Sequence, residues 1–394
     1  MLMFSASSIV LLISVTRISG AFLSGVFSIG WAVCQQMLTV GQFGSRNVQV
    51  SDLDENFKFT DFLLSKLITI PLMLMLSLIY SNFIKLNYQE TIIALVLTLL
   101  MSSEVIADVF AGFFQKNEKL AFTGLSYFFR VLTYDILFVL ILIVFKNITL
   151  SIVIASISSY LWLILIDFKI IIEYFNLDFK FRVNNIVSIY KVCFSIFIGL
   201  FLTNYIVNIP KNSIAIHLST ESQAVYNILA MPSFIISLLF QMIVVPYYTS
   251  IASIFRDNIL KFIRTIMKIT LAIFCLTILF VVAGIYIGLP LMTLIFNIDI
   301  NHFDFVFGIL IISGGLSSIS IFYIYLLTLI NKTKFITYIY CANALISTFL
   351  GDYLVKFYEL KGAGLTYLFS TAFNSSILII IVMHYVFVKY KKFK

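Results

Sequence analysis

Charged residues are scarce in this sequence. Asp, Glu, Lys and Arg together make up 11% of its 394 residues, whereas a soluble domain carries about 25%. Hydrophobic residues make up 61%, and the mean hydropathy is +1.07. No polar region between the apolar stretches is long enough to fold as a domain. This composition excludes a soluble globular protein and places the chain inside a lipid bilayer.

Motifs for metal binding and nucleotide chemistry are absent from the sequence. It contains no HExxH motif, no Walker A motif and no glycine-rich phosphate loop, so the chain carries no ATPase of its own. We predict that it is not an enzyme and that it holds no metal and no cofactor. The four cysteines lie in hydrophobic segments without paired or metal-type spacing, which predicts core thiols: Cys34, Cys193, Cys275 and Cys341.

Twelve long apolar stretches fill the chain. A bilayer core about 30 Å thick needs about 20 helical residues per crossing. Segments such as Ile136 to Phe145 lack the polar face of a soluble helix, and a transmembrane β-barrel would show short alternating strands instead. The sequence therefore predicts an all-α polytopic membrane protein with crossings at about 1–16, 20–44, 61–80, 91–114, 120–145, 149–172, 187–208, 221–247, 265–288, 303–328, 335–355 and 362–388.

The first stretch is short for a membrane crossing. It has neither a basic n-region nor a clear cleavage site, so we interpret it as a transmembrane helix rather than a signal peptide. Sixteen helical residues span about 24 Å. We therefore expect residues upstream of Met1.

Basic residues are unevenly distributed over alternate joints between the stretches. Because basic loops stay in the cytoplasm, the richer side is predicted to be cytoplasmic, with both termini there. The net charge of +8 then reflects this bias and attraction to anionic membrane lipids, and does not indicate nucleic-acid binding. The richer side has 18 Lys and Arg, and the other has six: Arg17, Lys85, Lys146, Lys211, Lys356 and Lys361.

The longest cytoplasmic joint, from about Glu173 to Ile186, leaves six stretches on each side. Since six is an even number, both halves have the same orientation, as in transporters built from parallel repeats. The similar sequences VFSI at 26–29 and VYNI at 225–228 support an internal repeat. We predict an N-terminal six-helix lobe at 1–176, a cytoplasmic linker at 177–190 and a C-terminal six-helix lobe at 191–394.

Four groups of residues carry a family resemblance: SRNVQVSD at 45–52, QKN at 115–117 with Arg130, AVYN at 224–227 leading to Pro246, and Asn343 with GAGLT at 362–366. They follow the second stretch, join the fourth to the fifth, form the eighth and lead into the last. In these places the chain resembles the bacterial polysaccharide repeat-unit flippases. These are the Wzx-type O-antigen and capsule translocases of the multidrug/oligosaccharidyl-lipid/polysaccharide (MOP) superfamily.

The resemblance implies a carrier in the bacterial inner membrane, with two lobes around a central cavity that opens alternately to either side. Its substrate would be an oligosaccharide linked through pyrophosphate to undecaprenol, for O-antigen or capsular polysaccharide synthesis. Membrane lipids, a polysaccharide polymerase and a chain-length regulator would be its partners. A sugar headgroup needs such a cavity, because each unpaired polar group in hydrocarbon costs several kcal/mol.

Two other function classes remain open at this point. A multidrug, cation-coupled exporter of the same superfamily would favour an acidic, aromatic-lined cavity, whereas Arg130 and Lys66 favour an anionic ligand. A membrane polysaccharide polymerase or glycosyltransferase would carry a large extracytoplasmic loop with catalytic residues. No predicted outer joint here exceeds about 15 residues.

Ionisable residues inside the predicted crossings cluster in the first half. Such residues are costly in a bilayer and usually face a cavity or a partner. At the helical rise, Glu104 and Arg130 both lie about 15 Å from the cytoplasmic helix ends, and Lys66 and Asp108 both lie about 10 Å deep. We predict ion pairs of Glu104 with Arg130 and of Lys66 with Asp108. Asp135, about 22 Å deep, has no partner at its level.

Cations in and beside the crossings are the candidate substrate-binding residues. A guanidinium binds pyrophosphate through two parallel contacts, which favours Arg130. Lys211 would guide the headgroup outward. One alternative is that these intramembrane charges, including Arg130, Lys66 and Asp108, are purely structural contacts inside the first lobe. The others are a Lys66 that snorkels to the surface and a Lys211 that anchors at the interface. The full set is Arg130, Lys66, Lys211 and Arg46.

Acidic residues are the candidate coupling or ion-pair residues: Glu104, Asp108 and Asp135. Asp135 is the candidate site for a coupling ion, either a proton or sodium. A separate basic stripe lies on one face at the start of the ninth stretch: Lys261, Arg264 and Lys268. We predict that this stripe binds lipid phosphate, with substrate recruitment as the alternative.

Overall fold

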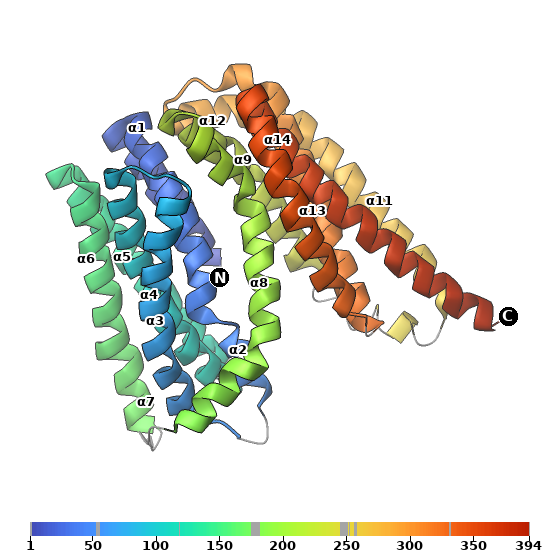
Figure 1. Ribbon diagram of the computed structural model, residues 1–394, viewed down its shortest axis with the longest axis horizontal. Helices are drawn as coiled ribbons and strands as arrows, with labels where there is room; N and C mark the ends of the chain where they lie inside the picture. The colour runs from blue at the N-terminus through green and yellow to red at the C-terminus, as the bar shows by residue number, and fades with distance from the viewer. Residues whose placement is uncertain are drawn as a thin grey trace. The chain divides into compact units, whose positions relative to one another are not determined.

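Long helices make up the computed structural model, which describes residues 2–52, 56–117, 119–174, 182–244, 251, 253–255, 258–330 and 332–393 (Figure 1). No strand occurs among these residues. The helices form two compact units, Met1–Asn208 and Ile209–Lys394. The prediction of an all-α protein is confirmed over the described residues.

The first unit contains the helices up to the middle of α8, including a π-helical segment, η1, that continues α6. They are α1 (Leu2–Gln42), α2 (Ser45–Ser51), α3 (Phe59–Phe83), α4 (Tyr88–Lys116), α5 (Leu120–Phe145), α6 (Ile148–Trp162), η1 (Leu163–Phe168), α7 (Lys169–Tyr174) and α8 (Val183–His217). The second unit contains α9 (Thr220–Val244), α11 (Ile259–Ala283), the π-helical η3 (Gly284–Gly288), α12 (Leu289–Phe296), the short η4 (Asn301–Phe303), α13 (Asp304–Leu329) and α14 (Lys334–Phe393).

Asparagine side chains start three of the helices. Asn87 accepts a hydrogen bond from the backbone N–H of Glu90, and the Glu90 carboxylate accepts one from the backbone N–H of Asn87, both at 2.9 Å. This reciprocal capping box begins α4. The side chains of Asn147 and Asn258 accept hydrogen bonds from the backbone N–H groups of the third residues of α6 and α11, at 3.0 and 2.9 Å. These caps satisfy backbone donors that the helix itself leaves unpaired.

Within the described residues, ten helical spans are long and apolar enough to cross a membrane, so the chain is a multi-pass membrane protein. One of them, α1, reverses direction at Gly20, whose φ of 85° lies in the left-handed region. Thr16 Oγ1 and Ser24 Oγ lie 2.7 Å apart across this break. In a straight helix, residues eight positions apart would be about 12 Å apart. The span therefore consists of two antiparallel segments.

A second reversal occurs in α14 at Glu359, where φ is 50°. Asn343 Nδ2 donates to the carbonyl of Ser370 at 2.9 Å, although 27 positions separate the two residues. A straight helix would place them about 40 Å apart. With α1 and α14 each contributing two segments, the ten spans provide twelve, in agreement with the twelve predicted stretches.

Close contacts at glycine residues pack the central helix of each unit against a neighbour. A Cβ atom at Gly41 of α1 would lie 2.4 Å from Val105 Cγ2 of α4. One at Gly314 of α13 would lie 2.7 Å from the backbone of Ser233 in α9. Only glycine permits these approaches. The helices α4 and α13 have more buried residues than their neighbours, so each is the core of its unit.

The seventh predicted crossing, α8, is tied to the first unit by hydrogen bonds. Tyr190 Oη donates to the carbonyl of Ser65 at 2.5 Å, and Asn204 Nδ2 donates to the carbonyl of Gln35 at 2.9 Å. The contact-based division between the units accordingly falls after Asn208. The predicted linker at 177–190 lies partly outside the described residues, as does Pro246.

The cysteine prediction is wrong for two of the four residues. Cys34 and Cys193 are buried, as expected, but Cys275 and Cys341 are exposed. An apolar segment does not specify which helix face meets protein and which meets lipid, because both environments are hydrophobic. The ninth crossing also ends later than the predicted residue 288, because η3 and α12 continue that span to Phe296.

Candidate functional site

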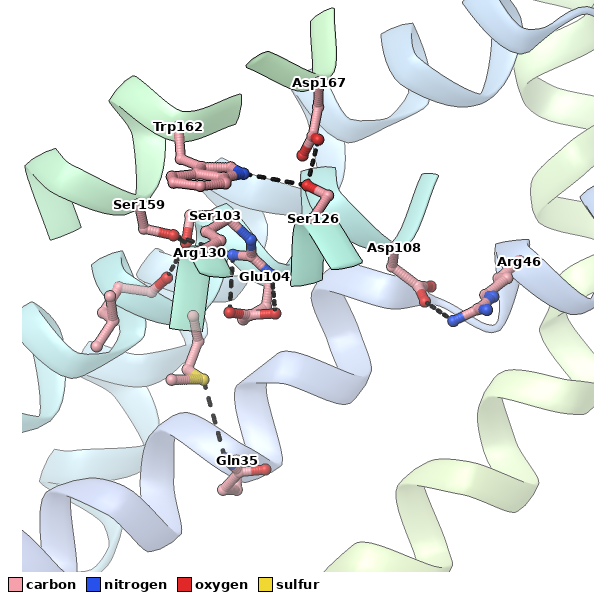
Figure 2. A network of polar contacts seen from close by, with 12 residues as sticks. Gln35, Arg46, Ser103, Glu104, Asp108, Ser126, Arg130, Ser159, Trp162 and Asp167 are labelled. Carbon is pink, nitrogen blue, oxygen red and sulfur yellow. Dashed lines mark hydrogen bonds and ion pairs between the residues drawn. The ribbon is translucent and has the colours of Figure 1, made fainter. Parts of the chain in front are cut away.

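A buried ion pair lies at the centre of the polar network in the first unit (Figure 2). Arg130 of α5 donates from Nη1 to Glu104 Oε1 at 2.8 Å and from Nη2 to Oε2 at 2.7 Å. The Arg130 side chain is 1% exposed and that of Glu104 is 3% exposed. The two residues predicted to pair from their equal depth are therefore in two-point contact.

Neighbouring groups complete the surroundings of Arg130. Its Nη1 also donates to Ser159 Oγ of α6 at 2.9 Å, and Ser159 Oγ lies 2.8 Å from Ser103 Oγ of α4. The guanidinium lies over the Tyr127 ring, 5.0 Å from its centroid. These contacts join α4, α5 and α6. Removing one member would leave the other charge buried and unpaired, at a cost of about 3–5 kcal/mol.

Arg46 forms a second ion pair from the short helix α2. Its Nη1 lies 3.4 Å from Asp108 Oδ1 of α4 (Figure 2). Its Nη2 donates to Gln115 Oε1 at 2.9 Å. The Arg46 side chain is 26% exposed and that of Asp108 is 16% exposed. The Arg46 side chain is thus partly exposed, whereas that of Arg130 is buried.

Lys66 of α3 does not pair with Asp108 as predicted. Its ammonium donates to the carbonyls of Gly41 and Gln42, at 3.2 and 2.9 Å, and to Ser45 Oγ at 2.7 Å. The chain turns at Phe43 and Gly44, which both have positive φ, and this turn brings the carbonyl end of α1 to Lys66. The side chain is buried, so the snorkelling alternative does not hold. A cation at this end of a helix is stabilised by the helix dipole.

Asp135 of α5 has a partner that the sequence did not indicate. Ser7 Oγ of α1 donates to its Oδ1 at 2.7 Å. The other oxygen, Oδ2, is buried and has no hydrogen-bond partner. A buried carboxylate with one free oxygen can accept a proton or contribute to a cation site. Its predicted role as the coupling residue stays a prediction.

Asp167 is a buried acidic residue that the sequence interpretation missed. Ser126 Oγ of α5 donates to it, and Trp162 Nε1 donates to Ser126 Oγ at 3.0 Å (Figure 2). Asp167 lies in η1, and π-helical segments often occur at functional positions. It falls inside the stretch predicted at 149–172, so the rule applied to the other intramembrane charges would have found it.

Lys211 lies in the part of α8 that belongs to the second unit. Its ammonium is over the Phe234 ring of α9, 5.6 Å from the centroid. At the end of α8, His217 Nε2 contacts Asp352 Oδ1 of α14. Among the described residues, no group of three or more His, Cys, Asp or Glu side chains could hold a metal ion. The predicted substrate role of Lys211 stays a prediction.

No family model matches this sequence, and no curated protein matches it either. Solved structures of similar fold do exist. A lipid II flippase, MurJ, in an inward closed conformation has a TM-score of 0.70 and 15% identity, over 97% of this chain and 87% of that one. An inward-facing MATE-family multidrug resistance transporter of the MOP superfamily has a TM-score of 0.69 and 11% identity, over 98% and 95%.

A third structure agrees with these two. A mutant of the Vibrio cholerae MATE transporter VcmN has a TM-score of 0.62 and 10% identity, over 98% of this chain and 93% of that one. At such low identities the likeness concerns the fold alone. The chain therefore has the fold of MOP-superfamily transporters over nearly its whole length.

Proposed function

We propose that this chain is a flippase of the bacterial inner membrane, with both termini in the cytoplasm. Its substrate is an oligosaccharide linked through pyrophosphate to undecaprenol, moved by alternating access for surface polysaccharide synthesis. Two features support this proposal. The fold is shared with a lipid II flippase, and the sequence segment that contains Arg46 resembles the repeat-unit flippases.

The contact between Arg46 and Asp108 is the observation that carries the proposal. At 3.4 Å it is longer than a charge-assisted hydrogen bond, which is about 2.7–2.9 Å. Both side chains are partly exposed. A pyrophosphate oxygen can therefore replace Asp108 at the Arg46 guanidinium without disrupting a buried pair. Arg130 already makes two hydrogen bonds to Glu104 and one to Ser159 in a buried position, so we assign it the role of holding α4, α5 and α6 together.

A multidrug exporter is the second candidate function. Asp135 favours it, because a buried carboxylate with one unpartnered oxygen suits a cation-coupled exporter. The fold is also shared with MATE transporters. The two candidates differ in the charge of the transported molecule, and therefore in their dependence on Arg46.

Deleting the gene in its own host tests the proposal. A flippase predicts loss of surface polysaccharide and accumulation of lipid-linked repeat units in the cytoplasmic leaflet. Complementation with Lys169→Ala should restore the polysaccharide, because Lys169 and Glu173 form an exposed surface pair of little energetic value. Complementation with Arg46→Ala should not. Repeat units that reach the outer leaflet but stay unpolymerised would identify a polymerase, and drug sensitivity with normal polysaccharide would identify an exporter.

A further inference from the structure

The helix α11 has two different faces. One face is buried, with side chains spaced four, seven and four residues apart, as one side of a helix requires: Phe262, Ile266, Ile273 and Thr277. They face the rest of the second unit, where a Cβ at Gly315 of α13 would lie 2.1 Å from Thr277 Oγ1. This face fixes α11 in the unit and leaves the opposite face uncovered.

The uncovered face of α11 changes character along its length. Its first turns carry three exposed cations, and exposed apolar side chains and Cys275 follow on the same face. The spacing of three and four residues keeps the whole row on one side of the helix. No acidic residue occurs in α11. In order, the row is Lys261, Arg264, Lys268, Leu271, Cys275, Ile278 and Val282.

This row matches an anionic phospholipid, because it is cationic at one end and apolar along the rest. Cations beside a bilayer attract anionic headgroups, each with about 1 kcal/mol, and the positive end of the helix dipole adds to the attraction. The apolar part from Leu271 to Val282 extends about 17 Å at the helical rise. One leaflet of the hydrocarbon core is about 15 Å thick, so the acyl chains fit along this part.

We infer that the uncovered face of α11 is a docking surface for an anionic membrane phospholipid. The phosphate contacts Lys261, Arg264 and Lys268, and the acyl chains lie along Leu271, Ile278 and Val282. A soluble anion would use only the basic part of the row, and the apolar part would contribute nothing to its binding. This inference does not depend on which molecule the protein transports.

Cys275 provides a local probe for this lipid, because its thiol is exposed on the same face. The experiment uses the full chain with Cys341→Ser, labelled at Cys275 with a fluorophore and placed in mixed vesicles. The lipid carries bromine, which quenches nearby fluorescence, on either phosphatidylglycerol or phosphatidylcholine. We expect stronger quenching by brominated phosphatidylglycerol at equal mole fraction, and a loss of that preference as salt rises.

Charge removal gives the decisive comparison. The variant K261Q/R264Q/K268Q should lower the preference for phosphatidylglycerol by about fivefold for each cation removed. The control variant K356Q/K361Q removes two cations near the reversal of α14. It should leave the preference for phosphatidylglycerol unchanged. Equal quenching by the two brominated lipids in the labelled protein that retains Lys261, Arg264 and Lys268 would overturn the inference. Loss of the preference on adding inorganic phosphate, beyond that in chloride of equal ionic strength, would also overturn it in favour of a soluble anion.

Discussion

Glu104 and Asp108 lie one helical turn apart on α4, yet they bind arginines from different helices. Glu104 holds Arg130 of α5 in a buried two-point contact, and Asp108 holds Arg46 of α2 in a longer, partly exposed contact. One face of α4 thus carries a closed ion pair and an accessible one. We therefore expect Arg130 to stabilise the first unit and propose Arg46 as the residue that contacts an anionic substrate.

Loss of the buried pair between Arg130 and Glu104 should destabilise the first unit, and we expect no direct effect on substrate binding. Arg130→Ala should lower the free energy of unfolding by about 3–5 kcal/mol, because Glu104 would stay buried without its partner. Replacing both residues, with Arg130→Met and Glu104→Leu, should restore most of that stability, since no charge is then left unpaired. Thermal unfolding of the purified protein in detergent measures both effects.

Exchanging the two charges separates a structural role from a ligand-binding one. Arg130→Glu combined with Glu104→Arg should recover stability and transport if the pair only fastens the helices, and this is the outcome we expect from its burial. A stable but inactive exchange variant would instead support the substrate-binding role that the sequence predicted for Arg130. Full transport by Arg130→Ala would contradict both roles.

Arg46 should affect transport with little effect on stability. Its pair with Asp108 is partly exposed, and such pairs contribute about 0–1 kcal/mol. Arg46→Ala should therefore keep the thermal midpoint while transport is lost. Arg46→Lys should restore transport only in part, because an ammonium cannot make two parallel contacts with a phosphate. Unimpaired transport by Arg46→Ala at normal protein levels would remove it from the substrate path.

Lys66 should behave as a structural residue. Lys66→Met would leave two carbonyls at the end of α1 and the Ser45 hydroxyl without their charged donor. Each unsatisfied buried polar group costs about 1–3 kcal/mol, so we expect a lower thermal midpoint. A Lys66→Met protein of unchanged stability but without transport would show instead that the ammonium acts on the substrate.

The outcome for the ion pairs shows what depth along a helix can predict. Glu104 and Arg130 were matched correctly because both lie on long, regular helices, where the rise per residue fixes their level. The same rule failed for Lys66, because its partners are main-chain carbonyls exposed by the turn at Phe43 and Gly44. Backbone groups at helix ends carry no side-chain signature in the sequence.

The reversals at Gly20 and Glu359 could be predicted from the sequence, whereas a side-chain contact between distant helices could not. Apolar stretch lengths predicted a break near both positions, because one crossing accommodates only about 20 residues. The partner of Asp135 could not be predicted in this way. Ser7 is one of many serines in apolar segments, and only the packing of α1 against α5 brings it to the carboxylate 128 positions away.

Asp135 should control coupling rather than substrate binding. Asp135→Asn removes the group that can take up a proton or bind sodium, while the amide can still accept from Ser7. We expect loss of accumulation driven by a proton or sodium gradient, with substrate exchange across the membrane retained. Gradient-driven accumulation at the unmodified rate would show that coupling occurs elsewhere.

The predicted orientation can be tested with reporter fusions. Fusions after Lys119 and Lys332 should report the cytoplasm, and fusions after Lys146 and at the α14 reversal after Glu359 should report the opposite side. The basic asymmetry of 18 to six residues is the reason for this assignment. Two or more reversed sites would contradict the arrangement of twelve crossings with cytoplasmic termini.

Direct measurement of substrate movement in vesicles tests the central claim. Purified protein is placed in vesicles that contain a polyprenyl-pyrophosphate oligosaccharide, and a sugar-binding lectin outside reports how much of it reaches the outer leaflet. We predict protein-dependent exposure of the sugar that Lys169→Ala preserves and Arg46→Ala abolishes. If the sugar stays inaccessible while the same vesicles transport a cationic drug, the chain is an exporter and the proposed flippase function is wrong.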